Sequence, residues 1–170
     1  IADALRHDRP SVLLDDWSRQ TVDDPIELRR RADLRLAAGD AAGAAQDYVQ
    51  VLRGAGRDLS LVTPMVSASS QGSRLAWTLL QVETLCSQQP GASAAWLVVG
   101  LISSAIGDDT ATIEAIERAE SLGVELGSGP RSALERAKAS IAVPTQGSSG
   151  LAPVLDDPVS RAIRLGHQEQ

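Results

Sequence analysis

The amino-acid sequence predicts an all-α fold, an array of antiparallel helical hairpins with capping helices at its ends. Apolar residues recur at helical spacing through most of the chain between residues 25 and 142. Short turns with glycine, and with aspartate, serine or proline where the next helix begins, separate these stretches. The stop glycines Gly39 and Gly107 lie 68 residues apart, twice a 34-residue period, and Gly72 is near the midpoint. Each hairpin of this kind leaves an apolar face that only a neighbouring hairpin covers.

The composition favours closely packed helices and argues against several classes of protein. The 170 residues are 43% hydrophobic, enough for one domain or one short repeat array, and they include three Trp, one Tyr and no Phe. A net charge of −6 makes nucleic acid a poor partner, because phosphate binding needs many basic side chains. The longest apolar stretch, residues 94–106, is shorter than the roughly 18 residues that a membrane span needs. It predicts a buried helix and no transmembrane segment.

The cellular compartment stays open at this stage. Cys86 is the only cysteine, so the chain forms no internal disulfide and no thiolate metal cluster. A soluble, cytoplasmic protein is slightly favoured over a periplasmic or membrane-anchored one. The chain does not begin with Met, which we interpret as a boundary of processing or of a larger protein. A single lysine, Lys138, against many arginines suggests a GC-rich, bacterial coding sequence.

The first predicted hairpin covers residues 25–54. Asp24 is an N-cap, a proline follows at the first helical position, and Glu27 completes a capping box. Gly39 ends this helix in the left-handed conformation, and Asp40 caps the second helix.

The second and third hairpins are predicted at residues 60–88 and 93–122. In the second, a short helix starts at Pro64 and Ser73 caps a longer one. In the third, Ser93 caps a helix that Gly107 ends, and Asp109 caps the next. These boundaries give three hairpins in succession.

The rest of the chain divides into end pieces. A capping helix is predicted at 130–142, opened by proline, and a first cap near residues 5–17. Together with the hairpins they make a helical domain of residues 1–143. Residues 144–153, rich in Gly, Ser and Pro, predict a linker, and residues 154–170 a short helix and tail.

The hairpins resemble the tetratricopeptide repeat (TPR) family over residues 25–123, as about three divergent repeats. In the third unit the matching residues are Trp96, Val99, Gly100, Gly107 and Ala119, and in the first they are Leu28, Ala32, Gly39, Ala44 and Tyr48. The middle unit matches mainly through Pro90. The residues that depart from the pattern are Arg31, Val51, Ser103 and Thr112. The resemblance implies a right-handed superhelical solenoid.

The resemblance also implies a binding surface, because the first helix of each TPR hairpin usually lines a concave groove for a peptide or helix of another protein. The expected groove residues are Ile26, Arg29, Asp33, Leu36, Ser67, Leu97 and Leu101. Ala94 and a hydroxyl-rich stretch of Ser60, Thr63 and Ser70 extend the same surface. Asp33 stands where the TPR clamp for C-terminal carboxylates needs Asn, so an acidic peptide tail is a poor ligand. Ordinary solvated or inter-helix packing is the alternative for all of these positions.

Catalytic chemistry has little support in the sequence. The two histidines, His7 and His167, lie near the chain ends, and no metal-ligand spacing or phosphate-binding glycine loop is present. Four acidic pairs could serve as acid–base groups or as a cation site. They are Asp15 with Asp16, Asp23 with Asp24, Asp108 with Asp109, and Asp156 with Asp157. Three of them precede predicted helices, where capping explains them. We therefore predict no catalytic, cofactor-binding or metal-binding residues.

Three single residues have competing interpretations. Cys86 lies on an apolar helix face and is expected to be buried and unreactive. Trp96 is expected in the core, while Trp77 is either core or a platform for a ligand.

The leading functional hypothesis is a non-catalytic adaptor, assembly factor or chaperone. One alternative is a regulatory or homo-oligomerisation domain of a larger protein. Another is an all-helical enzyme or small-molecule binder that uses Asp15, Asp16 or Trp77.

Overall fold

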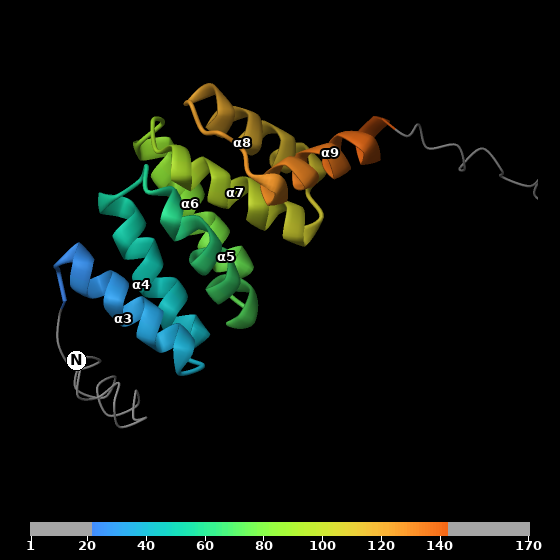
Figure 1. Ribbon diagram of the computed structural model, residues 1–170. Coiled ribbons are helices and arrows are strands. Elements are labelled where there is room, and N and C mark those ends of the chain that lie inside the picture. The colour runs from blue at the N-terminus through green and yellow to red at the C-terminus, as the bar shows by residue number, and fades with distance from the viewer. Residues whose placement is uncertain (1–21, 143–170) are drawn as a thin grey trace, which may run out of the picture.

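The computed structural model describes residues 22–142 and shows an array of helices joined by short turns (Figure 1). Within this range the elements are α3 (Pro25–Ala37), α4 (Ala41–Gly54), a 3-10 helix η1 (Leu59–Leu61), α5 (Val62–Gln71), α6 (Leu75–Gln88), α7 (Ser93–Ile106), α8 (Asp109–Ser121) and α9 (Ser128–Ala142). No β-strand occurs in this part of the chain, and none of its helices is long and apolar enough to cross a membrane. The predicted first cap near residues 5–17, the linker and the last helix lie outside the described residues.

The helices pack as successive hairpins. The pairs α3 with α4 and α7 with α8 have the most extensive contacts, and α9 packs on both α7 and α8. The middle hairpin is looser, because α5 and α6 contact each other less than they contact α4 and α7. Where α5 and α6 do meet, the buried hydroxyls of Ser69 and Thr78 share a hydrogen bond of 2.9 Å. The divergent middle repeat therefore depends on its neighbours for packing.

Short side chains and glycines set the ends of the first hairpin as predicted. The Asp24 carboxylate accepts a hydrogen bond from the amide of Ile26, and the Asp40 carboxylate accepts one from Gly43 at 2.9 Å. Gly39 has a φ of +87°, which reverses the chain after α3. Gly107 ends α7 in the same way, with a φ of +84°. These caps confirm the sequence predictions, but the predicted capping box does not form, because the Glu27 carboxylate accepts from Arg30 Nη1 at 2.6 Å.

Three predicted caps were wrong. Ser93 is inside α7, whose N-cap is Ala92 and has no side-chain cap bond. Ser73 has a φ of +53°, in the left-handed region, and the N-cap of α6 is Arg74, again without a side-chain bond. The third error is a shift of one residue: Asp108, and not Asp109, accepts from Ala111.

Two helices begin before their predicted proline. The helix α5 starts at Val62 after the 3-10 turn, and α9 starts at Ser128. Pro64 and Pro130 are then the third residues of their helices. A proline is tolerated there because amides of the first turn have no partner within the helix. Both α5 and α9 thus begin two residues before the proline that was expected to open them.

A continuous apolar core runs through all the described hairpins. Its largest fully buried side chains are Tyr48, Leu52, Leu61, Met65, Ile102 and Ile116. Close approach of α7 and α8 depends on Gly100, where an added Cβ would lie 2.5 Å from Ile116 Cγ1. Cys86 is buried, as predicted, whereas Trp96 is only partly buried against this core.

A buried ion cluster joins α3 to α4. Asp47 is 2% exposed and accepts from Arg31 Nε at 2.9 Å, from Arg31 Nη2 at 2.8 Å and from Arg35 Nη1 at 2.9 Å. Arg31 departs from the TPR pattern, and this bidentate pair is the reason that a charged residue is accepted there. A charged residue, Asp47, on the otherwise apolar face of α4 could have indicated this buried pair from the sequence. This signal was not used in the prediction.

Candidate protein-binding surface

The first helices of the later hairpins form one layer of the array. The helix α5 lies beside α7, and α7 lies beside α9. The helix α3 is linked to the same layer by Arg29, whose Nη1 donates to Asp58 Oδ2 at 3.0 Å and to Ser60 Oγ at 2.8 Å. We call the surface of α3, α5 and α7 that carries the seven expected groove residues the groove face.

The polar residues of the groove face are accessible to different extents. Asp33 is exposed and accepts a 2.5 Å hydrogen bond from the hydroxyl of Tyr48. Ser67 is half-buried, and its hydroxyl accepts from Gln71 Nε2 at 2.8 Å. Arg29 is partly exposed and paired as described above. All three residues thus have intramolecular partners and remain at least partly exposed.

The apolar residues of the groove face differ more widely in their solvent exposure. Ile26 is 64% exposed in the first turn of α3, while Leu97 is 6% exposed and belongs to the core. Leu36 and Leu101 are partly buried and pack against that core. No hydrogen bond or ion pair among the described residues joins any two of the seven groove residues. Ile26, Leu36 and Leu101 are thus the apolar side chains of the groove face that are at least partly exposed.

Charges at the groove face affect two nearby groups. Hydrogen bonds from the hydroxyl and amide of Ser60, followed by the charge of Arg29, lower the pKa of Asp58. Burial and the hydrogen bond to Asp33 raise the pKa of Tyr48. Sequence reasoning missed Asp58, although an aspartate two residues before Ser60 is a recognisable cap for a short helical turn.

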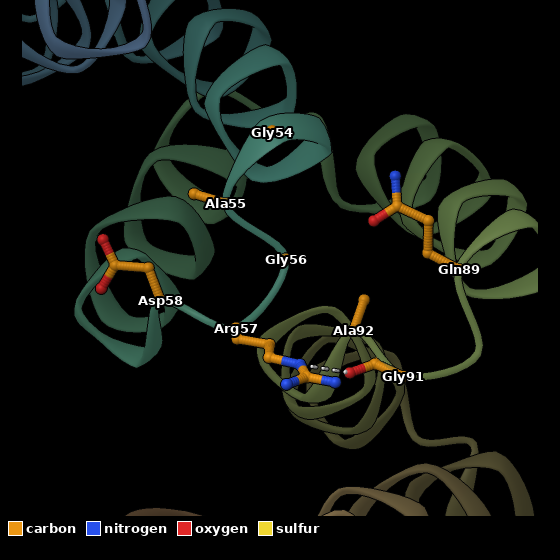
Figure 2. A pocket seen from close by; sticks show the side chains of 8 residues that line it. All are labelled: Gly54, Ala55, Gly56, Arg57, Asp58, Gln89, Gly91 and Ala92. Carbon is orange, nitrogen blue, oxygen red and sulfur yellow. Dashed lines mark hydrogen bonds between the residues drawn. The ribbon is translucent and has the colours of Figure 1, made fainter.

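A cavity of about 540 Å³ lies at the edge of the array, between the turn after α4 and the turn after α6 (Figure 2). Its lining residues are Gly54, Ala55, Gly56, Arg57, Asp58, Gln89, Gly91 and Ala92. The two turns are one repeat apart, and Arg57 Nε donates to the carbonyl of Gly91, 34 residues later, at 3.3 Å. The amide of Ala94 also donates to the carbonyl of Gly56.

The polar side chains that line this cavity are those of Arg57, Asp58 and Gln89. Figure 2 shows the Arg57 side chain lying against Gly91, and the Asp58 carboxylate on the far side of its turn. An added Cβ at Gly56 would lie 2.8 Å from Ala92 Cβ, so glycine permits the close approach of the two turns. The residues that line this cavity therefore hold the turn after α4 against the turn after α6.

Trp77 lies on α6, the second helix of the middle hairpin. It is half-buried, and the Arg74 guanidinium carbon is 5.8 Å from the centre of its ring. A cavity of about 170 Å³ separates it from Gln46, Val49 and other side chains of α4. Asp15 and Asp16, which one alternative hypothesis combined with Trp77, lie outside the described residues.

Comparison with known proteins gives a fold likeness and no sequence match. No protein-family model and no curated protein matches the chain. The crystal structure of the Sgt2 TPR domain from Aspergillus fumigatus is similar, with a TM-score of 0.54, 20% identity, and coverage of 75% of this chain and 91% of that one. A MamA RS-1 double mutant has a TM-score of 0.46 and 16% identity, over 84% of this chain and 93% of that one. The first of these likenesses, with the stacked hairpins described above, shows that the chain folds as a TPR-like array of helical hairpins.

Proposed function

We propose that this protein is a non-catalytic adaptor, assembly factor or chaperone, and that its groove face binds a peptide or helix of another protein. The observation that supports it is the side-by-side placement of α5 and α7, with α3 tied to η1 through Arg29. Helices in one layer offer a continuous surface along which an extended or helical segment can lie.

The side chains of the groove face favour a segment of mixed polarity. Arg29 and Asp33 provide one donor group and one acceptor group near the first hairpin, and Ser67 adds a hydroxyl on α5. Leu101 is partly exposed on α7 and offers apolar contact. A partner that displaces the Arg29–Asp58 pair must supply its own acceptor, because an unpaired guanidinium would lose charge-assisted hydrogen bonds.

The experiment uses peptides selected on the whole protein from a random display library. Their affinities are then measured by isothermal titration calorimetry for the wild type and for Ser67→Arg, which places a long charged side chain on the groove face. The matched control is Thr84→Arg on α6, because Thr84 is an exposed hydroxyl residue outside the groove face. Circular dichroism verifies that both variants are folded.

We expect Ser67→Arg to weaken binding at least about tenfold, which corresponds to roughly 1.4 kcal/mol. Thr84→Arg should leave the affinity unchanged. Equal affinities in all three proteins would contradict the proposal, as would selection of peptides that only Thr84→Arg rejects.

A further inference from the structure

A third hollow lies apart from the seven residues of the groove face. It has a volume of about 240 Å³ and is formed by α6, α7 and α8. Its lining residues are Glu83, Cys86, Ser87, Trp96, Val99, Ala111, Glu114 and Ala115. None of the seven groove residues is among them. We call this hollow the Trp96 pocket.

The floor of the Trp96 pocket is apolar and held in place. Cys86, Val99 and Ala115 are each at most 4% exposed. The indole of Trp96 is half-buried, and its Nε1 donates to the carbonyl of Pro90 at 3.1 Å. This bond fixes the ring against the turn before α7. The floor therefore presents a rigid aromatic surface with few competing polar groups.

The rim of the Trp96 pocket is negative. Glu83 comes from α6 and Glu114 from α8, and both are exposed. Within the described residues, neither carboxylate makes a hydrogen bond or an ion pair. Burial, and after it the charge of Glu83, raises the pKa of the Cys86 thiol. The Glu83 carboxylate is thus close enough for its charge to act on the pocket floor.

We propose that the Trp96 pocket binds an arginine side chain presented by a protein partner. An arginine guanidinium is planar, stays charged, stacks on indole rings and donates several hydrogen bonds to carboxylates. One aromatic floor with two carboxylates at the rim complements all of these properties. The volume also lies below the range of about 300–1,000 Å³ that is usual for small-molecule sites, and suits one side chain. The net charge of −6 further favours a basic partner.

This inference does not depend on peptide binding at the groove face. The probe is N-acetyl-arginine amide, titrated into the ¹⁵N-labelled full chain at low salt while heteronuclear correlation spectra are recorded. The reporter is the indole N–H signal of Trp96, assigned by its loss in Trp96→Phe. N-acetyl-citrulline amide has the same shape without the charge, and N-acetyl-lysine amide has the charge without the planar group.

The arginine probe should shift the Trp96 signal in a saturable manner. The citrulline probe should shift it far less, and lysine should bind more weakly than arginine. The double variant Glu83→Gln/Glu114→Gln should weaken arginine binding about fivefold, which corresponds to roughly 1 kcal/mol in total for two exposed ion pairs. Glu120→Gln is the matched control, an exposed glutamate of α8 outside the pocket, and should change nothing.

Four outcomes would overturn the inference. The Trp96 signal could fail to move at 100-fold excess of the arginine probe over about 0.1 mM protein, the citrulline probe could bind equally well, or the double variant could bind like the wild type. Stronger binding of lysine than of arginine would show a cation site without the planar selectivity proposed here, and would refute the assignment to arginine.

Discussion

At the scale of single residues, charge inside the fold is balanced locally. The carboxylate of Asp47 is buried between α3 and α4 and receives two donors from Arg31 and one from Arg35. The Arg35 guanidinium also donates to the carbonyl of Gly43. Each charged group that has lost water in this cluster thus has protein partners, as buried charges require.

Removing the Asp47 carboxylate should be strongly destabilising. Asp47→Ala removes the buried carboxylate that accepts hydrogen bonds from both Arg31 and Arg35, and we expect a loss of about 3–5 kcal/mol in the free energy of unfolding. Urea denaturation followed by circular dichroism measures it. Asp23→Ala, at an exposed aspartate, is the control and should stay within about 0.5 kcal/mol of the wild type. A loss below 1 kcal/mol for Asp47→Ala would show that the cluster is not structurally important.

The buried thiol of Cys86 predicts a pH effect. Burial first, and then the charge of Glu83, raises its pKa from 9.0 to about 12. The folded state thus keeps the proton that the unfolded chain releases above about pH 9. The contribution of Cys86 to stability is complete below pH 9 and decreases as pH rises towards 12.

Thermal or urea unfolding between pH 7 and 11 tests this effect, with Cys86→Ala as the comparison. The variant should be less stable at pH 7, because it leaves a small cavity, but its stability should decrease less steeply above pH 9. The raised pKa of Tyr48 acts in the same direction in both proteins and does not affect the difference. Parallel curves for the two proteins would contradict the role of the thiol.

At the scale of helices, the positions of aspartate, glycine and apolar residues predicted where helices begin and end, whereas the positions of serine did not. Asp24 and Asp40 cap their helices because each carboxylate accepts a hydrogen bond from an amide two or three residues later in the chain. Ser73 cannot do so, since its positive φ turns the backbone away from a capping geometry. Sequence alone does not reveal φ at a residue other than glycine, and the error at Ser73 has that origin. The error at Ser93 is a shift of one residue, because Ser93 is the first residue of α7 and Ala92 is its N-cap.

The contact between α7 and α8 depends on one missing methyl group. Gly100→Ala should destabilise the protein by about 1–3 kcal/mol, because the new Cβ would meet Ile116 Cγ1 at 2.5 Å. Gly54→Ala, at the end of α4 with nothing within 4 Å of the added Cβ, should be neutral or stabilising by up to about 1 kcal/mol. Differential scanning calorimetry of both variants decides the matter. If Gly100→Ala matched Gly54→Ala, the helices would not be in the close contact described.

At the scale of the whole molecule, periodicity predicted the hairpin array, and the likeness to the Sgt2 TPR domain supports it. The sequence predicted less well which residues are exposed on the proposed binding surface. Repeat register placed Leu97 on the groove face, yet it is buried, because how far neighbouring helices cover a residue depends on their packing. The Trp96 pocket is formed by residues from three helices, and no local pattern in the sequence indicates that Glu83 and Glu114 lie at one rim.

Chemical-shift mapping of the ¹⁵N-labelled protein with a selected peptide tests the proposed binding surface most directly. If the groove face binds the peptide, the largest shifts should fall on α3, α5 and α7, and include Arg29, Ser67 and Leu101. Shifts confined to α4, α6 and α8, or to the turns around Gly56 and Gly91, would contradict binding at the groove face.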